Sequence, residues 1–369
     1  MNQARKIETM QQIVGAFIFP EVWQAWKEMD AAYAFETLLR FGVNAVFTES
    51  EVYRDDLIAL AHQLGLRWFG GIACFSDHAH QNQILRDRPE MWPIDEIGAR
   101  RPQMEWYVGL VPTFEDYNAS RIELAGRLVR AHDLDGFMLD FIRWPIHWEL
   151  ELRPGMDEPL QCSFDPHTLA RFQEETSIRL PEHLGNGGQE QQPLAASRAA
   201  WILAHHAQAW YNFRCGIITK FCQEAVATLR AARGRELLVG LYALPLPMDS
   251  LARIAGQRLS DLALLVDLIA PMVYHAILHR PVRWVGDTVQ AFAHSFPGQV
   301  LPVVQVDSAE GAEAGADWGP PMPVSEWEEV LRITLAQAGI RGLVAFTGTA
   351  LFRTGRGECL RSILGPSQG

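Results

Sequence analysis

Short apolar segments and amphipathic segments alternate along most of this chain. The apolar segments are residues 13–19, 43–47, 66–75, 136–142, 237–244, 268–274, 300–306 and 342–346. None of them alternates polar with apolar residues, which is typical of strands buried on both faces of a parallel sheet. Between them, apolar positions recur at helical spacing, as in the helix predicted over 30–41, which Gly42 is placed to end. Eight such strand and helix units predict an α/β fold, a closed (β/α)8 TIM barrel rather than an open doubly wound sheet.

Two long segments interrupt this alternation. Residues 80–104 follow the third predicted strand, and residues 146–200 follow the fourth. Loops of this length inside a compact domain are usually functional or disordered. We therefore expect one barrel domain over residues 10–365 with long loops after strands 3 and 4, and with 146–200 forming a loop and helical insertion over the active-site rim.

Local signals predict where several helices begin and end. Asp165-Pro166 is a good start for a helix, because the aspartate can cap the first turn and proline suits its first position. One long helix is expected over 196–233 and another near 250–265. The sequence Ser325-Glu-Trp-Glu328 has the pattern of a capping box that opens a helix to Ala338.

Charge and cysteine content exclude several classes of function. The formal net charge is −12, whereas nucleic acids and anionic membrane surfaces require clustered Lys and Arg. No apolar run approaches the length of a membrane span. The five cysteines are odd in number and lack metal-ligand spacing, so reduced thiols in a cytosol are expected. We expect no nucleic-acid partner and no membrane partner, while the oligomeric state stays open.

The first residues and the first strand bear on the cellular location of the protein and on its cofactors. Residues 1–12 are polar and lead straight into a strand, so no signal peptide is visible and a cytoplasmic location is expected. A trimmed secreted form remains the alternative. No glycine-rich turn follows the first strand, which argues against dinucleotide binding. No cofactor and no metal are expected.

One charged residue stands out within the apolar strands. Asp140 lies near the end of the segment 136–142, where a charge is costly to bury unless it is paired or used. Arg143 follows three residues later and offers a permanently charged partner. Trp144 then adds a flat apolar face, and Pro145 ends the strand. A structural Asp–Arg pair is the alternative to a catalytic one.

Other polar and aromatic residues follow the remaining strands. In a barrel of this kind the site lies at the carboxyl ends of the strands. The residues expected there, with those of the loop after strand 4, are Glu49, Arg143, Trp144, Trp148, Tyr242, Tyr274, His275 and Gln305. Carboxylates, aromatic rings and amides with few cations suit a neutral polyhydroxylated ligand. We therefore expect a carbohydrate substrate.

The segment Asp135-Gly-Phe-Met-Leu-Asp-Phe-Ile-Arg-Trp-Pro145 resembles the DGIHLDYIRYP type of motif of the glycosyl-hydrolase-like family 10 barrels. Gly109 to Thr113, Ser163 to Pro166 and Ala270 to His275 are similar to further segments of that family. The resemblance covers most of residues 10–350. It implies a barrel active on glycosides and related to the α-amylase-type glycosidases, with Asp140 as its fourth-strand acid. Many members are secreted or lipid-anchored, and this chain departs from that.

The fourth strand does not match the motif of a second group of barrels, the chitinases. Chitinase-like barrels carry D-G-x-D-x-D-x-E on the fourth strand, with the last Glu as acid. Here Asp135 and Asp140 match two of the acidic positions, whereas Met138 and Ile142 replace the others. Substrate-assisted chemistry of that type is therefore not expected.

Glycoside hydrolysis needs one protonated and one ionised carboxyl group on either side of the bond. We expect Asp140 to stay ionised beside Arg143 and to act as nucleophile or charge stabiliser. Glu149, Asp307 and Glu49 compete as proton donor. We choose Glu149, because a glutamate after Trp148 can have its pKa raised by packing against an indole.

Two other functions remain open. Asp77, His78, His80, His147 and His275 offer imidazole and carboxylate groups for a metal-dependent hydrolase. The H-x-H after strand 1 that an amidohydrolase type of barrel would carry is absent. A barrel that binds saccharides without cleaving them is the second alternative.

Overall fold

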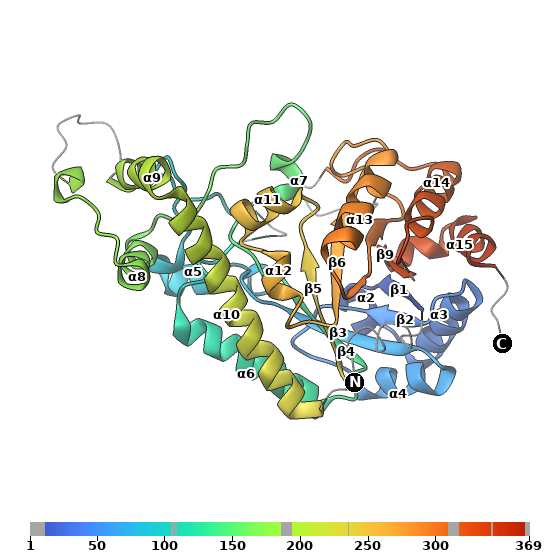
Figure 1. Cartoon of the computed structure of the whole chain (residues 1–369). Helices are drawn as coiled ribbons and strands as arrows, with labels where there is room; N and C mark the ends of the chain where they lie inside the picture. The colour runs from blue at the N-terminus through green and yellow to red at the C-terminus, as the bar shows by residue number, and fades with distance from the viewer. Residues whose placement is uncertain are drawn as a thin grey trace.

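The computed structural model describes residues 12–104, 107, 109–185, 194–234, 236–308, 317–340 and 342–365. Parallel strands form a closed barrel at the centre (Figure 1). Around the barrel they are β1 (Ile13–Phe17), β2 (Ala45–Phe47), β3 (Arg67–Ala73), β4 (Gly136–Asp140), β5 (Leu238–Ala243), β6 (Leu268–Val273), β7 (Gln299–Val300), β8 (Val303–Gln305) and β9 (Gly342–Phe346). Each strand pairs in parallel with its neighbour, and β9 pairs with β1 to close the ring. The predicted (β/α)8 barrel is confirmed.

The seventh strand of the barrel is made of two pieces. β7 and β8 both pair with β6, and the short gap between them contains Pro302. Proline has no N–H to donate to a sheet ladder, which explains the interruption of the expected strand 300–306. The carbonyl of Pro302 still accepts the Val344 N–H at 2.8 Å, so the barrel stays closed.

Helices surround the barrel on its outside. They include α3 (Glu28–Arg40), α4 (Asp55–Leu64), α6 (Glu115–Ala131), α10 (Ala207–Arg233), α13 (Arg283–Ser295), α14 (Val324–Leu335) and α15 (Arg356–Leu364). Figure 1 shows α6 and α10 side by side along one flank, and these two helices are in extensive contact. A short helix, α2 (Pro20–Gln24), follows β1 and was not expected from the sequence. No described helix is both long enough and apolar enough to span a bilayer.

Two predicted helices are broken. The segment expected as one helix over 196–233 consists of α9 (Leu194–His205) and α10, which meet at His206. The helix expected near 250–265 is replaced by α11 (Met248–Ser250), a π-helical turn over Leu251–Ala255 and α12 (Leu259–Leu262). Gly256, with φ +73°, ends the π-helical turn. A Cβ at Gly256 would lie 2.6 Å from the ring of Trp144, so this glycine also makes room for the indole.

Of the two predicted helix starts, one is confirmed and one is wrong. α8 (Pro166–Thr176) begins as predicted, and the Asp165 side chain accepts the Thr168 N–H at 2.9 Å. The predicted capping box at Ser325 is wrong. α14 begins one residue earlier, after Pro323, without a side-chain cap.

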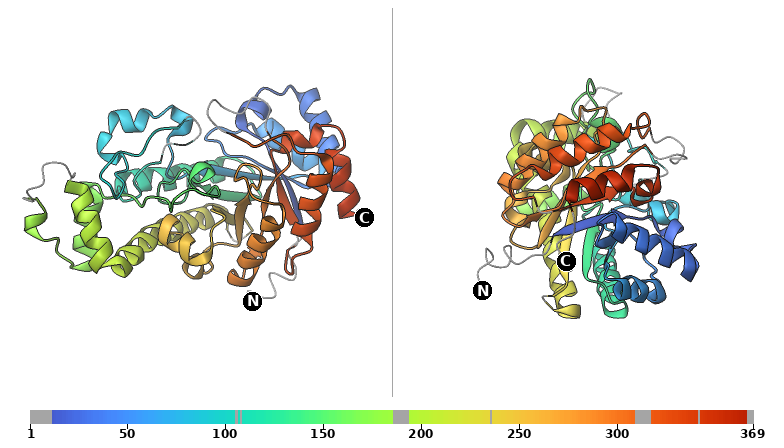
Figure 2. Two further views of the ribbon diagram at one scale, coloured as in Figure 1. Left: turned by 90° about the horizontal axis from the view of Figure 1, so that it is seen from above. Right: turned by 90° about the vertical axis from the view of Figure 1, so that its right-hand side faces the viewer.

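The two long segments after β3 and β4 pair with each other. The Glu96 N–H donates to the Gln161 carbonyl at 3.0 Å, and the Phe164 N–H donates to the Ile94 carbonyl at 2.8 Å. Ser163 adds a bond from the Ile94 N–H to its hydroxyl at 3.0 Å. Figure 2 shows these segments, together with α8 and α9, extending to one side of the barrel.

The backbones of β1 and β9, the two strands that close the barrel, lie so close at Gly342 that a side chain there should destabilise the fold. A Cβ at Gly342 would lie 1.8 Å from the carbonyl oxygen of Ile13, a backbone atom that cannot move aside. Gly342→Ala should therefore lower the free energy of unfolding by about 3 kcal/mol or more. Gly216→Ala is the matched control, because a Cβ on this exposed position of α10 meets nothing within 4 Å. We expect the control to be stabilised by about 1 kcal/mol through helix propensity. Urea unfolding measures both, and equal stabilities of the two variants would contradict the closing register.

Candidate functional site

Two carboxyl groups meet at the carboxyl end of the barrel. Asp140 is the last residue of β4, as predicted, and strand alternation places it on the same face as Met138. Glu49 follows β2, where the N–H groups of Thr48 and Ser50 continue the pairing with β3. This extension of the ladder fixes Glu49 beside the ends of β3 and β4. The side chains of Glu49 and Asp140 form a hydrogen bond.

The two carboxyl groups differ in their surroundings, and this difference determines which of them holds the proton that they share. Burial raises the pKa of Glu49 well above its usual range, and the charge of Asp140 raises it further. The Glu49 side chain is only 14% exposed. Burial also raises the pKa of Asp140 above its usual value, but the charge of Arg143, the N–H of Phe141 at 2.6 Å and the hydrogen bond from Glu49 oppose this rise. Glu49 therefore holds the proton and Asp140 carries the charge.

Neutral polar groups complete the surroundings of the pair. Burial, followed by the repulsion of Arg143, lowers the pKa of His78 to about 4, so its ring is neutral at pH 7. Its Nε2 lies 3.5 Å from Oε1 of Glu49, and its Nδ1 lies 2.9 Å from the Ser76 hydroxyl. Burial and the charge of Asp140 raise the pKa values of Tyr242 and Tyr274 well above 10. These two phenols remain protonated and available as hydrogen-bond donors.

Arg143 is close to the pair but is not its direct ion-pair partner. The guanidinium, on a residue 2% exposed, lies over the rings of Tyr107 and Phe141, with 4.7 Å and 4.8 Å from its carbon to the ring centroids. Its Nε and Nη2 have no hydrogen-bond partner among the described residues. The sequence predicted a direct Asp140–Arg143 pair. In the structure, Arg143 instead lies between two aromatic faces. Its charge opposes the rise in the pKa of Asp140 without a direct ion pair.

A stack of aromatic rings extends from the site along the rim. Tyr274 stacks on Phe346, with centroids 4.5 Å apart and planes at 11°. Phe346 in turn stacks on Trp318, at 5.4 Å and 16°. The carbonyl of Trp318 accepts a bond from Gln305 Nε2 at 2.9 Å, which holds this loop residue in place. From the sequence, His78 was considered only as a metal ligand, and neither Phe346 nor Trp318 was selected. Position at the end of a predicted strand was an available signal for Phe346.

Glu149 and Trp148 lie in a short helix, α7 (Trp148–Glu151), after β4. The Oε2 atom of Glu149 is buried, and the charge of Glu149 raises the pKa of Tyr274. Trp148 is 1% exposed and its ring lies 5.5 Å from that of Tyr274. Trp148 is therefore a packed residue beside Tyr274, and Glu149 is close enough to Tyr274 for its charge to act on that phenol.

Four residues selected from the sequence have structural partners instead. Trp144 is fully buried and donates its Nε1–H to the Arg214 carbonyl at 3.0 Å. His275, 2% exposed, pairs with Glu326 at 2.9 Å. Gln305 accepts the Ile277 N–H and donates to the carbonyls of Asp307 and Trp318, so its amide is fully used.

Asp307 is the fourth of these residues. Its Oδ1 accepts the N–H groups of Ser308 and Met322, and its Oδ2 pairs with Arg353 at 2.7 Å and Arg356 at 2.5 Å. These partners outweigh the effect of burial and lower its pKa. A carboxylate stabilised in this way does not hold a proton at neutral pH, so the structure does not favour Asp307, one of the competing candidates, as the proton donor.

The histidines considered as metal ligands are dispersed. His78 faces Glu49 and Ser76, whereas His80 lies 3.4 Å from both Glu51 and Asp77. Within the part of the chain that the structure describes, no group of three or more His, Cys, Asp or Glu side chains is arranged to hold a metal ion.

Comparisons with known proteins match the fold but not the sequence. No family model and no curated protein sequence matches this chain. The glycoside hydrolase domain of PgaB (BpsB) from Bordetella bronchiseptica is similar with a TM-score of 0.66 and 14% identity, covering 96% of this chain and 99% of that one. The catalytic domain of a Paenibacillus polymyxa β-amylase gives 0.61 and 11%, covering 95% and 97%. A β-galactosidase from Halorubrum lacusprofundi gives 0.58 and 12%, covering 90% and 52%. Likeness at these identities shows a shared barrel, and function has to be argued from the site.

The raised pKa of Glu49 predicts a distinctive pH dependence of stability. Between pH 4.5 and the folded-state pKa, the folded protein holds a proton that the unfolded chain has released. The free energy of unfolding should therefore fall as pH rises, by up to about 1.4 kcal/mol per pH unit. Glu49→Gln lacks this titration, so its stability relative to the parent should grow between pH 5 and 7. Urea unfolding at several pH values measures this difference, with Glu36→Gln on the exposed face of α3 as control. A constant difference across that range would show that Glu49 titrates normally.

Proposed function

We propose that this protein is a glycoside hydrolase. The observation that carries the proposal is the partly buried hydrogen-bonded pair of Glu49 and Asp140, in which the proton is held by Glu49 and the charge by Asp140. Two carboxyl groups with separated pKa values are the catalytic requirement of glycosidic bond cleavage. Their position at the carboxyl end of the strands is where barrel enzymes carry their active sites.

Asp140 takes the role of the ionised carboxylate. Its charge is adjacent to the space where a sugar ring would develop oxocarbenium character, and it would stabilise that charge or attack the anomeric carbon. The N–H of Phe141 and the charge of Arg143 keep Asp140 ionised.

Two residues compete for the role of proton donor. Burial and the charge of Asp140 raise the pKa of Glu49 well above its usual range, which favours Glu49 as general acid. Glu149, chosen from the sequence, acts on the site residue Tyr274 through its charge. We assign the donor role to Glu49, since its raised pKa has an identified cause.

A carbohydrate substrate fits the remaining lining. The stacked rings of Tyr274, Phe346 and Trp318 offer an apolar wall for the C–H faces of sugars. The protonated phenol of Tyr242 and the neutral ring of His78 supply hydrogen bonds to hydroxyl groups. The similar structures are named as a glycoside hydrolase domain, a β-amylase and a β-galactosidase, all of which act on glycosides.

Asp140→Asn should abolish turnover and leave the fold intact. The amide keeps the volume of the carboxyl but removes the charge that stabilises the transition state, so kcat should fall by about 10³-fold or more. Turnover on a panel of aryl glycosides and the melting temperature should be measured on the same preparation. If the residual folded protein kept its activity while the melting temperature fell, Asp140 would be a structural anchor. Saccharide binding by the parent without turnover on any glycoside would instead favour a non-catalytic barrel.

Glu49→Gln and Glu149→Gln separate the two possible donors. Loss of the general acid should lower kcat by about 10²- to 10⁴-fold on substrates with poor leaving groups and much less on dinitrophenyl glycosides. It should also remove the fall of the pH–rate profile on the alkaline side, where the acid loses its proton. We expect both effects for Glu49→Gln, with Glu149→Gln as the matched comparison. The opposite result would return the donor role to Glu149.

A further inference from the structure

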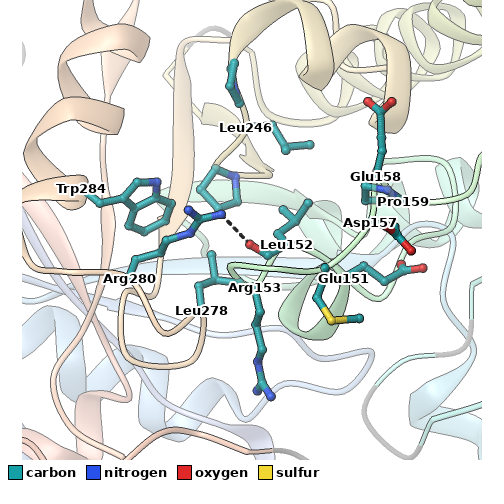
Figure 3. Close-up of a pocket in the computed structure, with 13 residues that line it drawn as sticks. Glu151, Leu152, Arg153, Asp157, Glu158, Pro159, Leu246, Leu278, Arg280 and Trp284 are labelled. Atoms are coloured by element: carbon teal, nitrogen blue, oxygen red, sulfur yellow. Dashed lines mark hydrogen bonds between the residues drawn. The ribbon is translucent and has the colours of Figure 1, made fainter.

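A cavity of about 320 Å³ opens on the rim of the barrel, outside the carboxyl pair. Three loops line it, residues 151–159 after β4, 245–247 after β5 and 278–284 after β6 (Figure 3). The same three strands carry Asp140, Tyr242 and Tyr274 at their carboxyl ends. The cavity and the candidate site therefore share one face of the barrel and one sector of its strands.

Helix α7 connects the cavity with the site directly. Glu149, near its first residue, acts on Tyr274, and Glu151, its last residue, lines the cavity. Glu151 is held by Arg101, which pairs with it at 2.5 Å, and it accepts the His147 N–H at 2.7 Å. The candidate site and the cavity are thus adjacent along α7, a short helix that these bonds hold in place.

The lining combines an aromatic ring with polar groups. Trp284 lies beside Arg280 on one side in Figure 3, and Asp157 and Glu158 lie on the other. Leu246 and Leu278 add apolar contact between them. An indole with a guanidinium and carboxylates around it matches a sugar, which presents C–H groups to an aromatic face and hydroxyls to charged acceptors and donors.

The wall of the cavity is held by contacts between the loops. Arg280 Nη2 donates to the Leu152 carbonyl at 2.8 Å (Figure 3), and Arg153 Nε donates to the Ile277 carbonyl at 3.1 Å. Arg153 also pairs with Asp317 at 3.3 Å, next to Trp318 of the aromatic stack. The Nε of Arg280 is buried and has no hydrogen-bond partner among the described residues. A ligand that enters therefore meets a largely pre-formed surface.

We propose that this cavity is an accessory subsite that binds one sugar residue of a longer glycan whose glycosidic bond lies at Glu49 and Asp140. This inference rests on the proposed function and specifies its substrate as an oligosaccharide or polysaccharide chain. A volume of about 320 Å³ lies at the lower end of small-molecule sites, which suits one sugar residue rather than a cofactor. Trp284 provides the stacking face, and Arg280 with Asp157 holds the hydroxyl groups.

Chain-length dependence tests the subsite. In the Asp140→Asn background, calorimetry compares the di- and hexasaccharides of the maltose, cellobiose and chitobiose series. We expect at least one hexasaccharide to bind about tenfold more tightly than its disaccharide. Trp284→Ala should remove that gain, and Trp284→Phe, which keeps an aromatic face in the same fold, should retain most of it. Trp201→Ala is the matched control, because Trp201 is also partly buried but lies on α9, outside the cavity.

Turnover of the same hexasaccharides by the parent protein separates this inference from the proposed function. If a hexasaccharide binds more tightly than its disaccharide through Trp284 but is not hydrolysed, the subsite is supported and hydrolysis is overturned. Turnover with a gain that survives in Trp284→Ala supports hydrolysis and overturns the subsite. Absence of any chain-length gain in all three series also overturns the subsite.

Discussion

One proton shared by two largely buried carboxyl groups is the constraint around which this site is arranged. Two adjacent anions at Glu49 and Asp140 would each lose several kcal/mol of solvation on burial and would also repel each other. Protonation of Glu49 removes one of these charges, and the bond that it donates stabilises the other. The remaining anion is balanced by Arg143 at a distance rather than by direct contact. Asp140 is thereby ionised without being neutralised by an adjacent cation.

Side chains from outside the barrel hold the strand ends that carry this pair. Arg121 on α6 donates its Nε and Nη2 to the Ala73 carbonyl at the end of β3, at 3.0 Å and 2.6 Å. Gln257 donates to the carbonyls of Ile142 and Tyr242 and accepts the Leu244 N–H, which links the loop after β4 to the end of β5. These bonds satisfy backbone groups that lie beyond the regular ladder. Arg121 and Gln257 therefore help to position the carboxyl groups by fixing the strand ends that carry them.

The hydrophobic pattern predicts the barrel because strands buried on both faces leave a signal in every segment. The same pattern identifies Asp140, since a lone charge inside an apolar strand is conspicuous. It does not reveal which way a strand-end side chain turns. Asp307 and Gln305 lie at a strand end as Asp140 does, but their partners come from loops far along the chain, such as Arg353. The bond from Glu49 to Asp140 crosses β3 and depends on the register of three strands, which no local pattern encodes.

The charge balance of the site bears on the kind of molecule that it accepts. With a proton on Glu49, the charges of Asp140 and Arg143 are opposite, and so are those of the neighbouring ion pair of Arg121 and Glu51. His78 and the tyrosines stay neutral. A neutral sugar ring leaves this balance unchanged on binding. An anionic ligand would be repelled by Asp140, and a permanent cation would over-stabilise the ground state. Positive charge that develops only in the transition state meets an anion that is already in place, and that difference between the two states is what accelerates a reaction.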